Sequence, residues 1–410
     1  MIPEWTERSL EELCLFRREL ITPVSNGTRR YVGLEHLDPG NAKIARFGGE
    51  SEVRSTKHRF CAGDILYGKL RPYLDKAAVA EWDGVCSTDI LVFQPKDGVA
   101  DSCFLGFFVH TMDFVQHAVA TTDGVNHPRT SWSGLSGYRS LVPPLPEQRA
   151  IASVLSKIQA AVEVQDRTIA TLRELKAATM AKLFREGLRG EKLKQTEIGE
   201  MPESWEVARI GQVFEIQQGK ALSPKARRGV SPRPFLRTAN VSWSSLDLAE
   251  LDRMDFSDEE VARLALQHGD LLVCEGGEIG RSAIWRNEVP GCLYQNHVHR
   301  LRRSSDGVEP QFVAYWMQEA FTHLGVYGGV GNRTTIPNLS GTRLKALPIP
   351  LAPVPEQRAI ASVLSSIQAA QQVHLRRRDL LSDVFSSMLH LLMVGRVRVT
   401  PIMEERASNG

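Results

Sequence analysis

The stretch Pro146-Glu-Gln-Arg-Ala-Ile-Ala-Ser-Val-Leu-Ser-Lys-Ile-Gln-Ala-Ala161 occurs a second time in the chain, at residues 355–370. The two copies agree at 15 of 16 positions, and the exception is Lys157, which is Ser366 in the second copy. They begin 209 residues apart in a chain of 410 residues, a period too long for a solenoid repeat. This spacing predicts the duplication of a unit that consists of one domain and one long segment.

Each copy of the repeat predicts a long helix. Pro146 suits the first helical position, and Glu147 lies in the first turn, where the helix dipole favours an acid. Apolar residues then follow close to a 3.5-residue spacing, at Ile151, Leu155, Ile158, Val162, Ile169, Leu172 and Leu183, and again at Ile360, Leu364, Ile367, Leu381, Phe385, Met388 and Leu392. About forty residues at 1.5 Å each form a rod of roughly 60 Å.

The apolar stripe of such a rod needs a partner. Two rods in one chain most simply pack as an antiparallel coiled coil, and two unconnected surface helices are the alternative. The register between Ala370 and Met388 is one residue shorter in the second rod than in the first, which indicates either an irregular helix or a real difference in length.

The segments that precede the two rods also match each other, though loosely. Gly63-Asp-Ile-Leu66 matches Gly269-Asp-Leu-Leu272, and Leu135-Ser-Gly137 matches Leu339-Ser-Gly341. Short strand-like runs, helical stretches and many Gly and Pro positions occur in both segments. We therefore predict an α+β fold, with two similar mixed α/β domains separated by two long antiparallel helices in a pseudo-two-fold internal repeat. The predicted boundaries are 1–145 for the first domain, 146–190 for the first helix, 191–354 for the second domain, 355–400 for the second helix and 401–410 for a tail.

Composition and motifs exclude several classes of protein. The apolar runs are too short to span a membrane, the first residues are charged, and the six cysteines form no C-x-x-C pair, so we expect a cytoplasmic protein with reduced thiols. The chain contains neither a phosphate-binding G-x-x-x-x-G-K-[ST] loop nor the Asn/Asp-Pro-Pro-aromatic tetrapeptide of amino-methyltransferases. His297 and His299 could share one face of a strand, but no cluster of acids or cysteines in the sequence completes a metal site. We predict no catalytic residue, no metal and no cofactor.

The formal net charge of +2 hides local groups of basic residues. Six Lys or Arg residues and no acid lie between Ile216 and Leu246. Other basic strings are Lys69-Leu-Arg71-Pro-Tyr73 and Asn126-His-Pro-Arg-Thr130, with a counterpart of the latter at Asn332-Arg333. Arg, Asn and Thr side chains contact phosphates and the edges of bases in DNA. The alternative interpretation is a set of solvated basic loops.

Several of these strings together match the pattern of a known family. The carriers are Leu145-Pro-Glu-Gln-Arg-Ala-Ile151 and its copy Val354-Pro-Glu-Gln-Arg-Ala-Ile360, with softer support from Gly63–Tyr73, Cys86-Ser-Thr-Asp89 and Tyr294-Gln-Asn-His297. On these residues the chain resembles the specificity subunits of type I restriction–modification systems, and the resemblance covers nearly its whole length. It implies two target-recognition domains, each reading one half of a split target in double-stranded DNA.

The resemblance also implies partners. The helices would measure the unread gap in the target and dock two methyltransferase subunits, and a restriction subunit that translocates DNA would join the complex. The specificity subunit itself would carry no active site. Near-identity in the helices against loose similarity in the domains fits this implication, because the helices would present one surface twice while the domains read unlike half-sites of an asymmetric target.

We predict DNA contacts in both domains and partner contacts at the start of each helix. The predicted DNA contacts are Lys69, Arg71, Thr88, Asn126, Arg129 and Thr130 in the first domain, and Lys220, Arg237, Arg281, Asn296, Asn332 and Arg333 in the second. The predicted partner-binding residues are Glu147, Gln148, Arg149, Glu356, Gln357 and Arg358. Two alternatives remain: a coiled-coil adaptor that binds proteins, and a single-chain DNA nuclease or methyltransferase.

Overall fold

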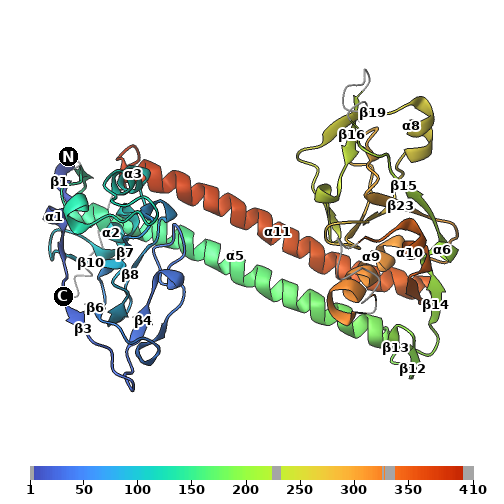
Figure 1. Ribbon diagram of the computed structural model, residues 1–410, viewed down its shortest axis with the longest axis horizontal. Helices are drawn as coiled ribbons and strands as arrows, with labels where there is room; N and C mark the ends of the chain where they lie inside the picture. Colours follow the sequence, from blue (N-terminus) through green and yellow to red (C-terminus); the bar gives the residue numbers. More distant parts are fainter. Residues whose placement is uncertain (1–3, 224–231, 326, 328–337, 400–410) are drawn as a thin grey trace, which may run out of the picture. The chain divides into compact units, whose positions relative to one another are not determined.

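The computed structural model describes residues 4–223, 232–325, 327 and 338–399. It divides into two compact units, the first formed by the residues up to 166 together with those from 376, and the second by residues 167–375. Figure 1 shows the elements of each unit coloured along the chain. The predicted tail at 401–410 lies outside the described residues.

The first unit is built around a four-stranded antiparallel sheet. Its order is β2 (Cys14–Phe16), β10 (Ile90–Pro95), β7 (Ile65–Gly68) and β8 (Ala77–Val79). A second sheet has the order β3 (Leu20–Ile21), β6 (Lys57–Phe60), β9 (Gly84–Cys86), β4 (Arg30–Val32) and β5 (Gly48–Gly49), in which β4 and β9 are parallel. The remaining elements are the pair β1 (Thr6–Ser9) and β11 (Arg139–Val142), and the helices α1 (Leu10–Leu13), α2 (Ser102–Phe108), α3 (Met112–Ala120) and α4 (Trp132–Leu135).

The second unit repeats this plan. Its four-stranded sheet has the order β15 (Phe214–Gln218), β23 (Val298–Arg303), β20 (Leu271–Cys274) and β21 (Ser282–Ile284). The other sheet has the order β19 (Asp252–Asp255), β16 (Pro232–Leu236) and β22 (Leu293–Tyr294), with β16 and β22 parallel. The remaining elements are the hairpin β12 (Leu193–Thr196) and β13 (Gly199–Pro202), the pairs β14 (Glu206–Arg209) with β24 (Pro348–Leu351) and β17 (Val241–Ser242) with β18 (Ser245–Leu246), and the helices α6 (Ile210–Val213), α8 (Asp258–Leu264), α9 (Pro310–Glu319) and α10 (Gly341–Ala346). The predicted pair of similar mixed domains is confirmed.

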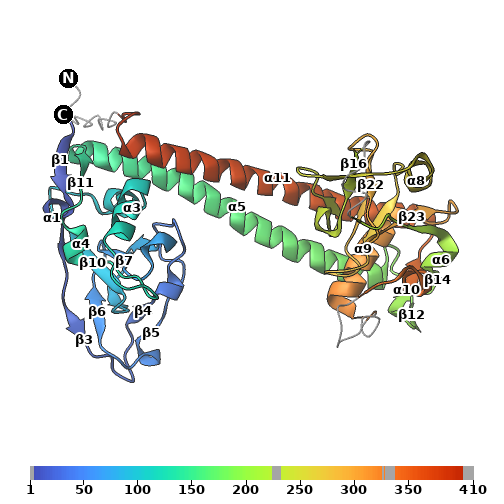
Figure 2. The same ribbon diagram turned by 45° about the horizontal axis from the view of Figure 1, so that its top comes forward.

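Two long helices, α5 (Leu145–Glu186) and α11 (Val354–Met393), each begin in one unit and end in the other. In the first unit, Ile151 and Leu155 near the start of α5 share a core with Leu392 and Met393 at the end of α11. The second unit shows the reverse arrangement, because Met180 and Phe184 at the end of α5 share a core with Ile360 and Leu364 near the start of α11. Within each unit the two helices therefore lie side by side in opposite directions, as both views show (Figures 1 and 2).

The two long helices keep the same register to their ends. Phe385 of α11 packs on Phe107 of α2, the helix that follows β10, with ring centroids 5.9 Å apart. Lys176 of α5 stands 209 positions before Phe385, and its ammonium group lies 5.1 Å from the ring of Tyr315 in α9, the helix that follows β23. The shortening expected between Ala370 and Met388 does not occur there, although α11 has 40 residues where α5 has 42. The second helix ends early instead, at Met393 before Gly395, whose φ of 70° is typical of a residue that terminates a helix.

Lys176 is a buried cation at a position where the first unit has an aromatic residue. Its ammonium group donates to the amide oxygens of Gln318 and Gln368, and its side chain is only 6% exposed. Burial lowers the pKa of Lys176 from the ordinary value of 10.5 to about 8. A charged group here is tolerated because two amides and one aromatic ring partly replace its water.

This depressed pKa predicts a pH-dependent stability. Between about pH 8 and 10.5 the unfolded chain binds more protons at Lys176 than the folded chain does, so the free energy of unfolding rises with pH in that window, by up to roughly 1.4 kcal/mol per pH unit. We expect Lys176→Met to remove this contribution. The measurement is urea unfolding from pH 7.5 to 10 for both proteins. Equal pH slopes in the two proteins would show that Lys176 does not titrate in this range.

Candidate nucleic-acid interface

The repeated Pro-Glu-Gln-Arg motif forms the junction between each domain and its helix. In the first unit the carboxylate of Glu147 accepts a hydrogen bond from the indole N–H of Trp5 at 3.2 Å and is bound by Arg398 at 2.7 Å. In the second unit the carboxylate of Glu356 accepts from the indole of Trp205 at 3.4 Å and is bound by Arg189 at 3.4 Å. Both units thus contain the same Trp-Glu-Arg group.

The glutamine of the motif is also used internally. The amide nitrogen of Gln148 donates to the carbonyls of Val99 and Pro143, and its amide oxygen accepts from the N–H of Asp101. Gln357 makes the same three bonds, to the carbonyls of Gly307 and Ala352 and from the N–H of Glu309. Each glutamine therefore ties the first turn of a long helix to the loop before a domain helix.

Burial changes the interpretation of the predicted partner-binding residues. Glu147, Gln148, Glu356 and Gln357 are at most 4% exposed and have partners inside their own unit. This is at odds with docking through these side chains, because buried groups cannot reach another subunit. The arginines of the motif differ: Arg149 and Arg358 have 67% and 62% of their side chains exposed and lie 3.9 and 3.6 Å from Asp101 and Glu309.

In the first unit, four predicted DNA contacts come together where three loops meet. The backbone N–H of Lys69 donates to the carbonyl of Asp89, and the N–H of Thr130 donates to the carbonyl of Lys69. The N–H of Arg71 donates to the carbonyl of Pro128. Arg129 forms an ion pair with Asp89 at 3.0 Å. Backbone bonds thus bring Lys69, Arg71 and Arg129 together at one end of the sheet.

The other predicted contacts of the first unit are less uniform. Thr88 and Asn126 are exposed on the same loops. Thr130 is only 2% exposed, and its hydroxyl bonds to that of Thr121 at 2.9 Å, so its side chain supports the loop. Arg71 has a φ of 52°, a left-handed conformation that is uncommon for a residue with a side chain and is frequent at functional sites.

A shallow groove of about 330 Å³ lies beside these loops. It is lined by Phe16, Arg18, Leu91 and Trp132 together with Lys69 and residues 129–131 and 133. Phe16 packs 6.4 Å from the ring of His58, and burial and the nearby Lys69 both lower the pKa of His58, which favours the neutral imidazole. The sequence reasoning missed Arg18, although Phe16-Arg-Arg18 offered a signal as an aromatic residue followed by two cations.

In the second unit the predicted cations are largely engaged within the fold. The ammonium group of Lys220 pairs with Glu260 and also donates to the carbonyl of Asp255. Arg237 lies 3.2 Å from Asp252. Arg281 donates to the carbonyl of Thr238 at 3.0 Å, as Lys76 does to the carbonyl of Leu34 in the first unit. Arg281 and Lys76 thus make the same kind of bond, to a backbone carbonyl of their own unit, and this bond supports the fold.

The remaining predictions of the second unit fall on loops. Asn296 is half-buried, and its backbone bonds to Lys220 and Gln218. Asn332 and Arg333 lie outside the described residues. The sequence match of Leu135-Ser-Gly137 to Leu339-Ser-Gly341 is not a structural match, because Ser131 and Ser340 are the residues that cap α4 and α10.

In the structure, the carboxylate of Glu275 lies close to His297 and His299 of the second unit. Glu275 lies 3.9 Å from His297 and 3.8 Å from His299, and it accepts a hydrogen bond from Gln218 at 3.0 Å. Burial lowers the pKa of His299, which bonds to the carbonyl of Leu339. In the part of the chain that the structure describes, no group of three His, Cys, Asp or Glu residues could hold a metal ion.

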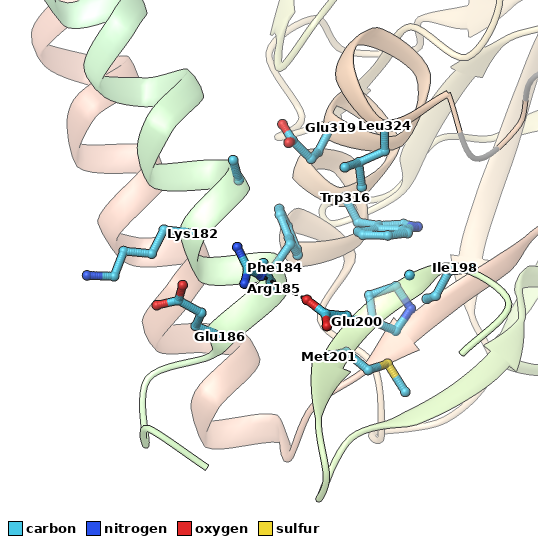
Figure 3. Close-up of a pocket in the computed structure, with 13 residues that line it drawn as sticks. Lys182, Phe184, Arg185, Glu186, Ile198, Glu200, Met201, Trp316, Glu319 and Leu324 are labelled. Carbon is cyan, nitrogen blue, oxygen red and sulfur yellow. Dashed lines mark hydrogen bonds and ion pairs between the residues drawn. The ribbon is translucent and has the colours of Figure 1, made fainter. Parts of the chain in front are cut away.

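An apolar cavity of about 580 Å³ in the second unit is separate from these residues. Phe184, Ile198, Met201, Trp316 and Leu324 line it, beside the end of α5 (Figure 3). None of the predicted DNA contacts lies on its walls. Of the helices in the described ranges, none is both long and apolar enough to cross a membrane.

Comparison with known proteins finds similarity to one family. The family described as "Type I restriction modification DNA specificity domain" matches residues 202–380. The specificity subunit of the type I restriction enzyme MjaVIII from Methanocaldococcus jannaschii is 26% identical over 82% of this chain and 77% of its own length. The putative MjaX specificity subunit of the same organism is 23% identical over 97% of this chain and 95% of its own length.

A solved structure shows the same fold. The S subunit of a type I restriction–modification system from M. genitalium matches with a TM-score of 0.61 and 14% identity, over 96% of this chain and 99% of that one. Both relatives are named as specificity subunits, and the matches cover 82% and 97% of this chain. The chain is therefore similar to type I restriction enzyme specificity subunits along most of its length.

Proposed function

We propose that this protein reads an asymmetric, bipartite sequence in double-stranded DNA, with one domain for each half-site. The observation that carries the proposal is the contrast between the two units. They share the strand order of the four-stranded sheet, the domain–helix junction and loop bonding, yet the side chains on equivalent loops differ, as with Lys69 and Glu275. One scaffold that carries unlike side chains at equivalent loops, the half-buried Lys69 and the buried Glu275, fits the reading of two unlike half-sites.

The reading surface of each domain lies on the loops at one end of its four-stranded sheet. Lys69, Arg71 and Arg129 form the basic part of this surface in the first domain, with Thr88 and Asn126 beside them. In the second domain Arg237 and Asn296 border the equivalent loops, and the predicted contacts Asn332 and Arg333 complete the set. In this proposal residues 1–145 and 191–354 are the two target-recognition domains.

The protein acts within a complex and not alone. In this proposal it docks two methyltransferase subunits, each on one copy of the repeated helix start, and restriction subunits join through that complex in the cytoplasm. Arg149 and Arg358 are the exposed side chains of the repeat that suit such docking, because they occur in both copies and point to solvent. The subunit supplies recognition, and its partners supply the chemistry and the cofactor for methyl transfer.

Deleting this chain from its host is expected to remove one split, asymmetric methylation motif from the genome. The reason is that a specificity subunit selects the sites at which its partners act. The measurement is single-molecule sequencing of methylated bases with and without the chain, and a plasmid copy of the gene is the control that restores the motif.

A band-shift experiment separates this function from that of a coiled-coil adaptor. The chain together with its methyltransferase partner should shift a DNA fragment that carries the motif at a salt concentration where a scrambled fragment stays free. An unchanged methylation pattern and an absence of sequence-dependent binding would favour the adaptor.

A further inference from the structure

The groove of the first unit presents cations whose charge is not used inside the fold. Among the described residues, neither the guanidinium of Arg18 nor the ammonium of Lys69 has a hydrogen-bond acceptor from the protein. No acid is among the described residues that line the groove, and Asp89, whose carbonyl accepts from the N–H of Lys69, is paired with Arg129 at 3.0 Å. The hydroxyls of Ser131 and Ser133 lie 2.9 Å apart on the same wall. The groove is therefore rich in donors and lacks a free carboxylate among the residues that line it.

An aromatic stack holds Arg18 in place. Phe93 of the core packs on Trp132 at 5.5 Å, and Trp132 stacks on Phe16 at 5.7 Å with the rings inclined by only 17°. The guanidinium carbon of Arg18 lies 5.2 Å from the centre of the Phe16 ring. A guanidinium that lies on a fixed aromatic ring loses little freedom on binding, which favours a specific contact over a loose one.

The equivalent place in the second unit carries the opposite chemistry. The N–H of Glu275 bonds to the carbonyl of His297 as that of Lys69 bonds to Asp89, and Leu339 donates to the carbonyl of Glu275 as Thr130 does to that of Lys69. These paired bonds make Glu275 the counterpart of Lys69. Strand pairing likewise places Gln218 of β15 where Arg18 follows β2. The second unit thus has a carboxylate and an amide where the first has two cations.

We propose that Arg18 and Lys69 read a guanine in the half-site of the first domain. This inference rests on the proposed function and names the base chemistry of that site. Guanine presents two acceptors, N7 and O6, in the major groove, and arginine or lysine donors are their commonest partners. Phosphates are also acceptors, but a guanidinium held on an aromatic wall within a groove fits a planar base edge better than an exposed backbone.

The test uses the complex of the full chain with its methyltransferase subunits, acting on a library of DNA sites with randomised half-sites. Arg18→Gln and Lys69→Glu introduce the residues that the second unit has at these places. We expect the wild-type motif to contain a guanine in the first half-site. Each variant should lower the preference for that guanine about tenfold while the other half-site stays unchanged.

Two further variants keep the result interpretable. Lys76→Arg introduces the second unit's counterpart at a residue that bonds within the fold, and it should leave the motif unchanged. Arg18→Lys keeps a donor at the same place and should retain the guanine preference, which separates a loss of recognition from a loss of folding.

The outcomes divide clearly. A motif without guanine in the first half-site, or variants that weaken methylation of all sites equally, would overturn the inference and mark Arg18 and Lys69 as phosphate contacts. A wild-type complex that methylates without any sequence preference would instead overturn the proposed function itself.

Discussion

Replacing Gln357 with leucine is expected to lower the free energy of unfolding of the second unit by about 3 kcal/mol. Gln357 is fully buried, donates to the carbonyls of Gly307 at 3.1 Å and Ala352 at 2.7 Å, and accepts from the N–H of Glu309 at 2.8 Å. Leucine fills a similar volume but leaves these three backbone groups without a partner. Each lost partner costs about 1–3 kcal/mol, and access of water to the exposed loop side reduces the sum.

The neighbouring arginine provides the matched control. Arg358 is in the same helical turn, 62% of its side chain is exposed, and its ion pair with Glu309 spans 3.6 Å. Arg358→Ala should change stability by less than about 1 kcal/mol, because exposed ion pairs contribute little. The measurement is urea unfolding of the full chain, followed by binding of the methyltransferase subunit to each folded variant. Equal destabilisation by the two substitutions would contradict the structural role given to Gln357.

Gln357 and Arg358 also show how much of the fold could be predicted from the sequence. Two identical copies of a motif indicate that both copies lie in the same kind of environment. The identity alone does not say whether that environment is the surface of a partner or the interior of each unit. The two long helices could be predicted because periodic apolar residues report local geometry. The burial of Glu147 and Gln148 could not, because it depends on Trp5, Arg398 and Val99, which lie far away in the sequence.

The candidate site shows the same limit. Lys69, Arg71 and Arg129 could be predicted as a set because they lie in basic strings on loops. The string Phe16-Arg-Arg18 signals a cation beside an aromatic residue, but it does not report the pairing of β2 with β10 that brings Arg18 to the site. Conversely, counting cations in the sequence overestimates the number that are available for DNA in the second unit. Lys220, for example, is paired with Glu260, which is 40 residues away in the chain.

The second prediction with a large effect concerns the aspartate that follows the matching glycine in each unit. Asp270 accepts two hydrogen bonds from Arg302, at 2.8 and 2.6 Å, and one from the N–H of Gln267 at 2.7 Å. Asp64 accepts the same kinds of bond, from Arg17 at 2.8 and 3.3 Å and from the N–H of Cys61 at 2.8 Å. Both aspartates are 2% exposed. The arginine comes from β23 in the second unit and from the end of β2 in the first, so the ion pair persists although its partner sits on a different strand.

The presence of the ion pair in both units indicates that the buried carboxylate stabilises each sheet, whichever strand supplies the arginine. Asp270→Ala should therefore destabilise the second unit by about 3 kcal/mol, since removal of one partner leaves a guanidinium that is only 26% exposed without its acid. Hydrogen exchange should quicken in β20 and β23 and stay unchanged in β7 and β10. Asp306→Ala is the control, because Asp306 is 95% exposed and pairs with Arg303 at 3.5 Å. Faster exchange in both units would show that their sheets are not stabilised independently. An equal effect of Asp306→Ala would show that the buried position of Asp270 does not matter.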